Sequence, residues 1–361
     1  MVECFVMSVP QPVGENSLGY RLPAEWESQE AVWFAWPVRE DIWPEKIDKV
    51  REQLVDLYIL AARFQQVRIL CPSLLQAPLR ALLVKAGSDK NILLYNYQTD
   101  DIWIRDFGPL FMLSLNTNHA VSIDCSFNAW GNKFPQQSLD DAATKWIAHQ
   151  LKIRCFNRKS LVLEGGSIDS NGSGTLLTTK AVLMNPNRLG PERVEEIELI
   201  FKRDLTIDKV LWLNEGLIGD DTDGHVDNVA RFFKPYSILV ATASKDSKNY
   251  RLLEENRSRL KKMSDAKGRT FNIVSIPLPA PIEVNEEPLV ASYLNFLVLN
   301  NAVLVPTFAQ AKSDQNALKI IANCFPGRQI VGFDCRIFIE EGGALHCMSL
   351  NQPAALANDQ K

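Results

Sequence analysis

Three segments of the chain combine acids, a histidine or a cysteine with apolar neighbours, the setting in which side-chain chemistry inside a folded protein is expected. The segments are DDIWIRDFGP at 100–109, GDDTDGHVDN at 219–228 and EEGGALHCMSLNQP at 340–353. Carboxylates, an imidazole and a thiol together can hold a cation, transfer protons and attack an electrophilic carbon. Each segment also has a purely structural interpretation.

The first segment places Asp106 close to Trp103 and next to Arg105. A carboxylate beside an indole suits a planar cation, because the acid can form a bidentate hydrogen-bonded pair and the ring face adds cation–π attraction. A capped turn with a structural Arg–Asp pair would use the same residues. Spacing alone favours that simpler interpretation.

The second segment places His225 and Asp227 two residues apart. In an extended segment they would project from the same side, so that a base and an anion face one ligand. Metal ligation competes with this interpretation, because three more aspartates precede the histidine. The calcium-loop pattern is not met, since with Gly224 as the loop glycine its first and last ligand positions would hold a glycine and an alanine.

The third segment places Cys347 after a glycine pair and next to His346. Adjacent residues on a strand point to opposite faces, so His346 is a poor general base for Cys347 and His225 is the natural candidate. A lone cysteine is nevertheless more often a small buried hydrophobe, and we interpret the other six cysteines in that way.

Composition excludes several classes of function. The net charge is −4 and no Lys/Arg-rich block occurs, so nucleic acid is not an expected partner. The sequence contains neither a P-loop nor a dinucleotide-binding glycine pattern, and its four histidines form no H-E-x-x-H motif. We therefore expect no cofactor and no catalytic metal. A mildly acidic protein is compatible with a cationic substrate.

The expected location is the cytoplasm. The seven cysteines never form C-x-x-C and are odd in number, which indicates neither a disulfide framework nor a zinc ribbon. The first residues, MVECFVMSVPQP, lack the basic and apolar regions of a secretion signal. No apolar stretch reaches the length of about 18 residues that a membrane span needs, so we expect no membrane association.

The predicted elements repeat in the order strand, strand, helix, strand. Helices are predicted at 46–65, 73–86, 138–151, 191–205, 246–264 and 315–325, each followed by a short apolar strand. No long Gly/Ser-rich or Pro-rich linker interrupts the repeats, so we expect residues 1–361 to form one domain, with a functional loop at 277–288. Glycine pairs at 165–166 and 342–343 each follow an apolar strand in this interpretation and would allow close backbone approach.

The three segments, together with RLPAEWESQEAVWFAWP at 21–37, LEGGSID at 163–169 and ASYLNFLVLNNAVLVPTF at 291–308, resemble the agmatine deiminase family. This family lies in the guanidine-modifying pentein superfamily, which includes bacterial peptidylarginine deiminases. The resemblance implies an α/β fold, a five-bladed pseudosymmetric propeller of ββαβ modules around a central active site. It also implies hydrolysis of a small cationic guanidine such as agmatine, in putrescine biosynthesis, by a homo-oligomer.

Site residues carry over from the family by position. The resemblance implies that Cys347 is the nucleophile, His225 the general acid and base, and Asp106 and Asp227 the carboxylates that clasp the guanidinium. The remaining positions are substrate-binding or supporting ones: Trp103 and Glu164 in the pocket, Asn295 as a hydrogen-bonding group and Asp221 near the far amine of agmatine. Radial repeats would each deliver one residue to a shared axis.

The sequence departs from the family at three positions. Gly343-Ala344-Leu345-His346-Cys347 replaces the usual G-N-I-H-C, Gln29 replaces a histidine, and Asp223 stands where asparagine is common. None of these changes removes a group that the chemistry needs. They leave open whether the substrate is agmatine, free arginine or a peptidyl arginine. A catalytically silent guanidinium- or polyamine-binding protein is the alternative from another class.

Overall fold

The repeated order of elements predicted from the sequence is present in the structure, a computed structural model that describes residues 19–117, 119–134, 137–190, 193–284 and 287–355. In each repeat, two strands pair antiparallel, a helix follows, and a third strand pairs parallel to the second. A helix between parallel strands covers the sheet, which explains why the middle strands are buried along most of their length.

The first two repeats lie in neighbouring stretches of the chain. The first contains β5 (Leu110–Ser114), β6 (Ala120–Ser126), α5 (Ser138–Leu151) and β7 (Cys155–Val162), with β1 (Tyr20–Arg21) paired to β5. The second contains β8 (Ile168–Ser170), β9 (Thr175–Thr179), the short α6 (Lys180–Leu183), α7 (Val194–Leu205) and β10 (Lys209–Leu213). Apolar side chains of these two repeats share one hydrophobic cluster.

The next two repeats follow the same plan. The third contains β11 (Ala230–Lys234), β12 (Ser237–Thr242), α8 (Tyr250–Leu260) and β13 (Asn272–Pro277). The fourth contains β16 (Leu297–Val298), β17 (Ala302–Thr307), α9 (Ala311–Cys324) and β18 (Gln329–Asp334). Between them β14 (Glu283–Val284) and β15 (Glu287–Pro288) form a small hairpin, within the loop predicted at 277–288.

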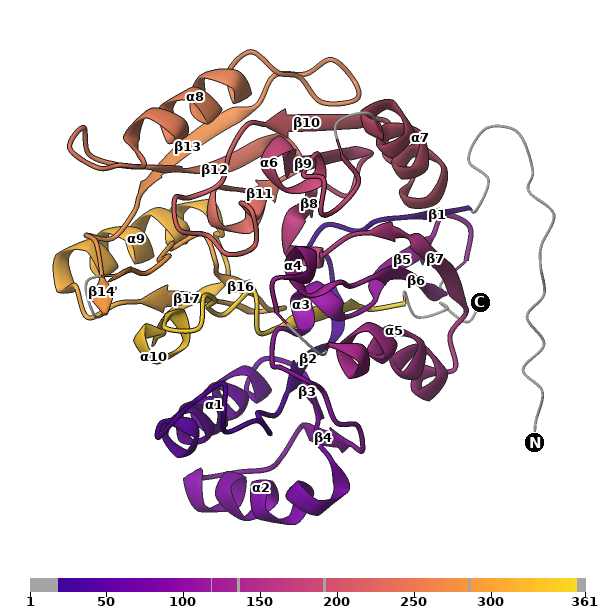
Figure 1. Cartoon of the computed structure of the whole chain (residues 1–361), viewed down its shortest axis with the longest axis vertical. Helices are drawn as coiled ribbons and strands as arrows, with labels where there is room; N and C mark the ends of the chain where they lie inside the picture. The colour runs from indigo at the N-terminus through magenta and orange to yellow at the C-terminus, as the bar shows by residue number, and fades with distance from the viewer. Residues whose placement is uncertain (1–18, 118, 135–136, 191–192, 285–286, 356–361) are drawn as a thin grey trace.

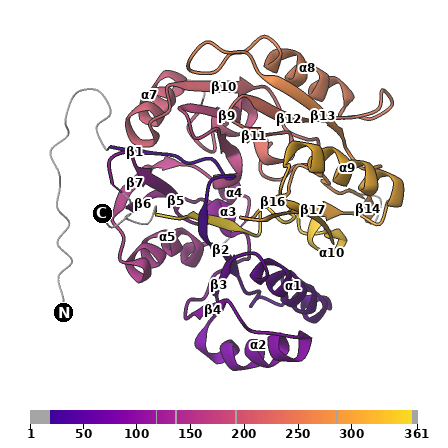
Figure 2. The same cartoon turned by 180° about the vertical axis from the view of Figure 1, so that it is seen from behind.

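The fifth repeat joins the two ends of the described chain. Its elements are β19 (Leu350–Pro353), β2 (Gln29–Ala35), α1 (Ile47–Ala62), β3 (Gln66–Leu70), α2 (Ser73–Ala86) and β4 (Ile92–Tyr95). The last strand pairs antiparallel with β2, with Leu350 opposite Trp33. In Figures 1 and 2 the sheets lie around the short helices α3 (Ile104–Phe107) and α4 (Ala129–Asn132), and the longer helices lie outside them.

Helix boundaries follow the apolar spacing where a buried stripe exists. The predicted helices at 73–86 and 138–151 match α2 and α5 to the residue. The helix predicted at 246–264 is wrong at both ends, because α8 spans only Tyr250–Leu260. Its fully buried side chains are Leu253, Asn256 and Leu260, so the buried stripe that supports a helix does not extend into 246–249 or 261–264.

Two further expectations need correction. The glycine pair 342–343 follows the short helix α10 (Arg336–Ile339) and not a strand. The start of the helix predicted at 191–205, including Pro191, lies partly outside the described residues, and α7 begins at Val194. Within the described ranges, no helix is both long enough and apolar enough to cross a membrane.

Candidate active site

A cavity of about 700 Å³ extends from the surface to Cys347 and Asp106. The indole rings of Trp103 and Trp130 form part of its wall, and residues 288–290 after the β14–β15 hairpin form another part. Several acids and one basic residue also line it: the exposed Asp41, Asp221 and Glu341, the half-buried Glu340 and Arg39, and the buried Asp101. The cavity therefore leads from an acidic entrance to a thiol beside a carboxylate.

Cys347 lies in a turn that is held by Asn295. The side-chain oxygen of Asn295 accepts hydrogen bonds from the backbone N–H groups of His346 (3.0 Å) and Cys347 (3.3 Å), and its Nδ2 lies 3.1 Å from Cys347 Sγ. The thiol also donates to Asp227 Oδ2 at 3.7 Å. Burial, together with the nearby charges of Asp227 and Asp106, raises the pKa of the Cys347 thiol well above its usual value.

His225, Asp106 and Asp227 converge on Gly166. A Cβ atom at Gly166 would lie 2.6 Å from His225 Nδ1, 2.8 Å from Asp106 Oδ1 and 3.1 Å from Asp227 Oδ2. Any side chain at this position would displace the three groups, so the glycine permits their close approach. The glycine pair at 165–166 thus has the function that its position after β7 suggested.

His225 is fully buried, and neither of its ring nitrogens has a hydrogen-bond partner among the described residues. Asp106 Oδ1 lies 3.7 Å from its Nδ1. Burial alone would lower the pKa of His225, but the surrounding carboxylates, with Asp106 the strongest, raise it above its usual value. An imidazolium in this position can give a proton to a leaving group.

Asp106 is held by two donors that do not carry charge. The backbone N–H of Gly166 donates to Oδ1 and the indole Nε1–H of Trp130 donates to Oδ2, both at 2.9 Å. Burial raises the pKa of Asp106, and the neighbouring Asp227 and Glu164 raise it further. A cationic group placed beside this carboxylate would favour its ionised form.

Asp227 is the better-stabilised carboxylate. His346 Nδ1 lies 2.8 Å from Asp227 Oδ2, and His346 Nε2 lies 2.8 Å from Glu25 Oε1. Burial acts to raise the pKa of Asp227, but the contact with His346 and the nearby cations hold it below its usual value. Asp227 Oδ1 has no hydrogen-bond partner in the described part of the chain, so it is available to a ligand.

The expectation that His346 and Cys347 project to opposite faces is wrong, because both side chains contact Asp227 Oδ2, His346 through Nδ1 at 2.8 Å and Cys347 through Sγ at 3.7 Å. Residues 345–348 form a turn rather than a strand. The assumption of an extended segment at 225–227 is also wrong, because His225 precedes the single 3₁₀ turn η3 (Val226–Asn228). The tight turn brings both side chains to the site without alternation along a strand.

The remaining aspartates of the second segment have separate partners. Asp220 Oδ1 accepts hydrogen bonds from the backbone and hydroxyl of Thr222, and Asp223 pairs with Lys133 at 2.7 Å. Asp221 is exposed at the cavity entrance. Among the described residues, no group of three or more His, Cys, Asp or Glu side chains is placed to hold a metal ion.

Glu164 adjoins the site but does not line the cavity wall. Its Oε1 accepts a hydrogen bond from Arg188 Nε at 2.6 Å, and both side chains are fully buried. Its Oε2 has no partner in the described ranges. One oxygen of the carboxylate is thus paired with a buried arginine, while its second oxygen remains without a described partner.

The first segment combines parts of both interpretations. Asp100 accepts the backbone N–H of Leu139 at the start of α5, so a capped turn is present. The structural Arg–Asp pair is absent among the described contacts, because Arg105 pairs instead with Glu25 at 2.7 Å. Trp103 lies in the cavity wall, where its ring packs against the backbone of Gly343.

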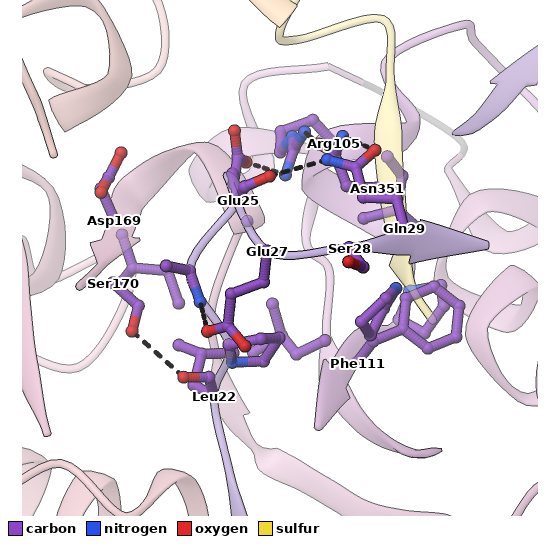
Figure 3. Close-up of a pocket in the computed structure, with 18 residues that line it drawn as sticks. Leu22, Glu25, Glu27, Ser28, Gln29, Arg105, Phe111, Asp169, Ser170 and Asn351 are labelled. Carbon is purple, nitrogen blue, oxygen red and sulfur yellow. Dashed lines mark hydrogen bonds and ion pairs between the residues drawn. The ribbon is translucent and has the colours of Figure 1, made fainter. Parts of the chain in front are cut away.

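A second, smaller pocket of about 80 Å³ contains Glu25 and Arg105 (Figure 3). Its charged side chains are paired with one another or with neighbours: Glu25 with Arg105, Arg231 and His346, Glu27 with Arg21, and Asp169 with Arg231. This pocket holds the outer end of the chain of contacts from Asp227 through His346 to Glu25. The thiol of Cys347 and the carboxylate of Asp106 line the larger cavity instead.

Sequence reasoning missed three residues that contact the predicted ones, Trp130, Arg188 and His346, and it missed Glu25, which contacts His346. A signal existed for His346 and Glu25, which lie within motifs singled out above. Trp130 and Arg188 lie in stretches with no dense polar pattern. Their roles depend on contacts between distant segments, which spacing does not reveal.

Comparison with known proteins agrees with this geometry. Residues 21–353 match the model of the Porphyromonas-type peptidyl-arginine deiminase family. The agmatine deiminase of Ectopseudomonas mendocina is 34% identical over 360 residues, covering 93% of this chain and 96% of that protein. Among solved structures, the agmatine deiminase of Enterococcus faecalis is 29% identical, with a TM-score of 0.88 over 96% of this chain and 100% of that one.

A second solved structure is that of a cysteine-to-serine variant of the C. jejuni agmatine deiminase with substrate bound. It is 30% identical, with a TM-score of 0.81, and the match covers 92% of this chain and 96% of that chain. The region that matches the family model includes all the residues that surround the cavity, from Arg39 to Cys347. With fold, length and sequence in agreement, the chain belongs to the family of Porphyromonas-type peptidyl-arginine deiminases and agmatine deiminases.

Proposed function

We propose that this chain is a hydrolase of the guanidino C–N bond, an agmatine deiminase that converts agmatine and water to N-carbamoylputrescine and ammonia. The observation that carries the proposal is the convergence of Cys347, His225, Asp106 and Asp227, of which Cys347 and Asp106 line the inner end of one cavity. The relatives named as agmatine deiminases, at 29–34% identity over most of the chain, support it.

A guanidinium is a poor electrophile, because attack at its central carbon destroys delocalisation. Two carboxylates address this by fixing the plane of the cation and by stabilising charge on its flanking nitrogens. Asp227 Oδ1 is free to accept N–H groups on one side, and Asp106 can accept them on the other. We assign the clasp to these two acids, with Glu164 Oε2 as a further acceptor.

The nucleophile is Cys347. Before a cation binds, its pKa is raised, so the thiol is protonated. A bound guanidinium offsets the charges of Asp227 and Asp106, which lowers the pKa of the thiol and lets its proton leave to solvent. The thiolate then adds to the central carbon in a tetrahedral adduct. Asn295, at 3.1 Å from the sulfur, holds it in position.

His225 serves both halves of the reaction. As an imidazolium it protonates the departing nitrogen, which leaves as ammonia, and a thiouronium linked to Cys347 remains. The neutral imidazole next takes a proton from water, whose oxygen adds to the same carbon. Expulsion of the thiolate, with transfer of the hydroxyl proton to that thiolate, then releases the neutral urea product. The buried carboxylates around His225 favour the imidazolium that the first half requires.

The cavity entrance supports a substrate with a second cationic group. Asp221 and Glu341 would attract an alkylamine, whereas the carboxylate of free arginine would meet like charge. The other two surface acids, Asp41 and Glu340, are paired with Arg39 and Lys46. Burial raises the pKa of Asp101 to about 7, and a bound ammonium would favour its ionised form. We assign the far amine to this entrance, with Asp221 as one contact.

The five repeats support the further proposal of a five-bladed α/β propeller formed by one catalytic domain. Assembly into a homo-oligomer, location in the cytoplasm and a role in putrescine formation remain expectations from the family resemblance. Light scattering would measure the oligomeric state.

Ammonia release from agmatine, free arginine and a peptidyl arginine tests the function. We expect agmatine to be the preferred substrate by kcat/KM, and the Cys347→Ala variant to show no turnover and no covalent adduct by mass spectrometry. Preference for either arginine substrate would leave the chemistry intact and change the substrate. Normal turnover by Cys347→Ala would overturn the mechanism.

A further inference from the structure

Four successive residues, of which Trp130 lines the cavity, adopt a left-handed backbone conformation. Their φ angles are 53° at Ala129, 52° at Trp130, 87° at Gly131 and 62° at Asn132. Only the glycine adopts this conformation without steric cost, so the other three are held there by their surroundings. Such a run at the site of the proposed chemistry requires an explanation.

The turn is fixed at both ends by hydrogen bonds and an ion pair, most of them to residues distant in sequence. Asn128 Oδ1 accepts the backbone N–H of Gly131 at 2.8 Å, and Asn128 Nδ2 donates to the backbone oxygen of Asn187 at 2.9 Å. After the turn, Lys133 Nζ contacts Asp223 Oδ1 at 2.7 Å and the backbone oxygen of Asp221 at 2.6 Å. These contacts compensate the unfavourable backbone.

The turn directs the indole of Trp130 toward Asp106. The ring is only 6% exposed and meets Phe127 and Phe134 edge to face, at centroid distances of 5.1 and 5.5 Å. Its Nε1–H donates to Asp106 Oδ2 at 2.9 Å. A right-handed conformation at this residue would point the ring elsewhere, and Asp106 would lose a donor.

The opposite side of the same turn contacts the group that holds Glu164. A Cβ atom at Gly131 would lie 2.5 Å from Arg188 Nη1, so the absence of a side chain allows the backbone to pack against the arginine. Arg188 in turn holds Glu164 at 2.6 Å. The turn therefore supplies the indole that holds Asp106, and its backbone packs against the arginine that holds Glu164.

We propose that Trp130 is a positioning residue for the reaction, and that the left-handed turn 129–132 exists to hold its indole N–H against Asp106. This inference rests on the proposed guanidine hydrolysis and adds a residue that acts through Asp106. The N–H fixes the orientation of the carboxylate without adding a cation that would compete with the substrate. An uncharged donor thus leaves the negative charge of Asp106 available to the guanidinium.

The Trp130→Phe variant tests the proposal, because it keeps an aromatic ring and removes the N–H. We expect kcat for agmatine to fall by about 10- to 100-fold, with a smaller change in KM. The indole hydrogen bond lowers the pKa of Asp106, so its loss should move the acidic limb of the kcat/KM profile to higher pH. Phe127→Leu is the matched control, since it loosens packing against the same ring and keeps the donor.

Urea unfolding of both variants separates stability from positioning. If Trp130→Phe does not fold, Asn128→Ala supplies the second measurement, because it removes the cap of the turn and keeps the indole; the same acidic shift is expected. An unchanged kcat and acidic limb in the folded variant, or an equal shift in Phe127→Leu, would overturn the inference. Failure of the wild-type chain to release ammonia from any guanidine would instead overturn the proposed function.

Discussion

At the scale of single residues, the two aspartates of the site differ in how they are stabilised. Asp227 has a histidine against one oxygen and its pKa is lowered, whereas Asp106 accepts hydrogen bonds from two neutral donors, with His225 3.7 Å away, and burial raises its pKa. The acid whose pKa is raised gains more from a cationic ligand. Asp106 should therefore contribute strongly to substrate binding and to attack.

Replacing Asp106 by asparagine tests this difference. We expect the activation free energy for agmatine to rise by roughly 3 kcal/mol, because the buried cation would lose its charged partner. The value of kcat/KM should then fall on the order of 10²-fold or more. The control is Asp246→Asn, which removes an exposed acid of the 244–249 turn. Similar kinetics for the two variants would contradict the assignment of Asp106 to the clasp.

The raised pKa of Cys347 gives a pH-dependent prediction. Without substrate, alkylation of Cys347 by iodoacetamide should stay slow at pH 7 and increase only at pH values above the usual range of a thiol, because the thiolate is the reactive form. A guanidine that binds without reacting should lower the apparent pKa. Site-resolved mass spectrometry distinguishes Cys347 from the other cysteines. Rapid labelling at pH 7 without ligand would disagree with a protonated resting thiol.

At the scale of elements, Gly166 determines how closely the segments of the site approach one another. The Gly166→Ala variant should lose most of its activity, because the added methyl group would displace His225 and both aspartates. We expect the variant to fold, since the conflict involves side chains that can move. Steady-state kinetics and circular dichroism together check this.

Gly332→Ala is the matched control for that experiment. Gly332 lies in β18, and its added Cβ would approach the Thr307 side chain at 2.9 Å, away from the cavity. Comparable activity losses in the two variants would indicate a general effect of glycine replacement. The convergence at Gly166 would then have no special importance.

Most helices and the repeat order were predictable because apolar spacing is a local property. The stripes in α1, α2 and α5 could be read from the chain, and each is present. The polar turn at 225–228 was misread as extended, because a polar segment of four residues has no periodicity to distinguish the two conformations. The sequence therefore singled out the segment at 225–228 but did not predict that it forms a turn.

The turn at 129–132 was not predictable from residue types. Alanine and tryptophan disfavour positive φ, so local preference excludes the conformation that the structure shows. It is maintained by Asn187, Asp223 and Asp106, which lie tens of residues away in sequence. The local φ preference of a residue type therefore does not predict the backbone where tertiary contacts hold a strained turn beside a proposed site. The catalytic roles themselves stay predictions until the variants are measured.

At the scale of the whole molecule, the site depends on the sheet that joins the ends of the described chain. Cys347 lies three residues before β19, whose pairing with β2 completes that sheet. Gln352 strengthens the pairing, because its Oε1 accepts hydrogen bonds from Trp33 Nε1 (2.8 Å) and Arg68 Nη1 (2.6 Å). The position of the thiol is therefore coupled to the closure of the fold.

The Gln352→Ala variant tests this coupling. We expect the free energy of unfolding in urea to fall by about 1–3 kcal/mol, because the donors of Trp33 and Arg68 would be left buried without their acceptor. Gln150→Ala, at the exposed end of α5, should change it little. Activity and tryptophan fluorescence should be lost at the same urea concentration in the wild type and in the variant. If activity disappeared well before the fluorescence change, the site would open independently of the sheet, and closure would not be what positions Cys347.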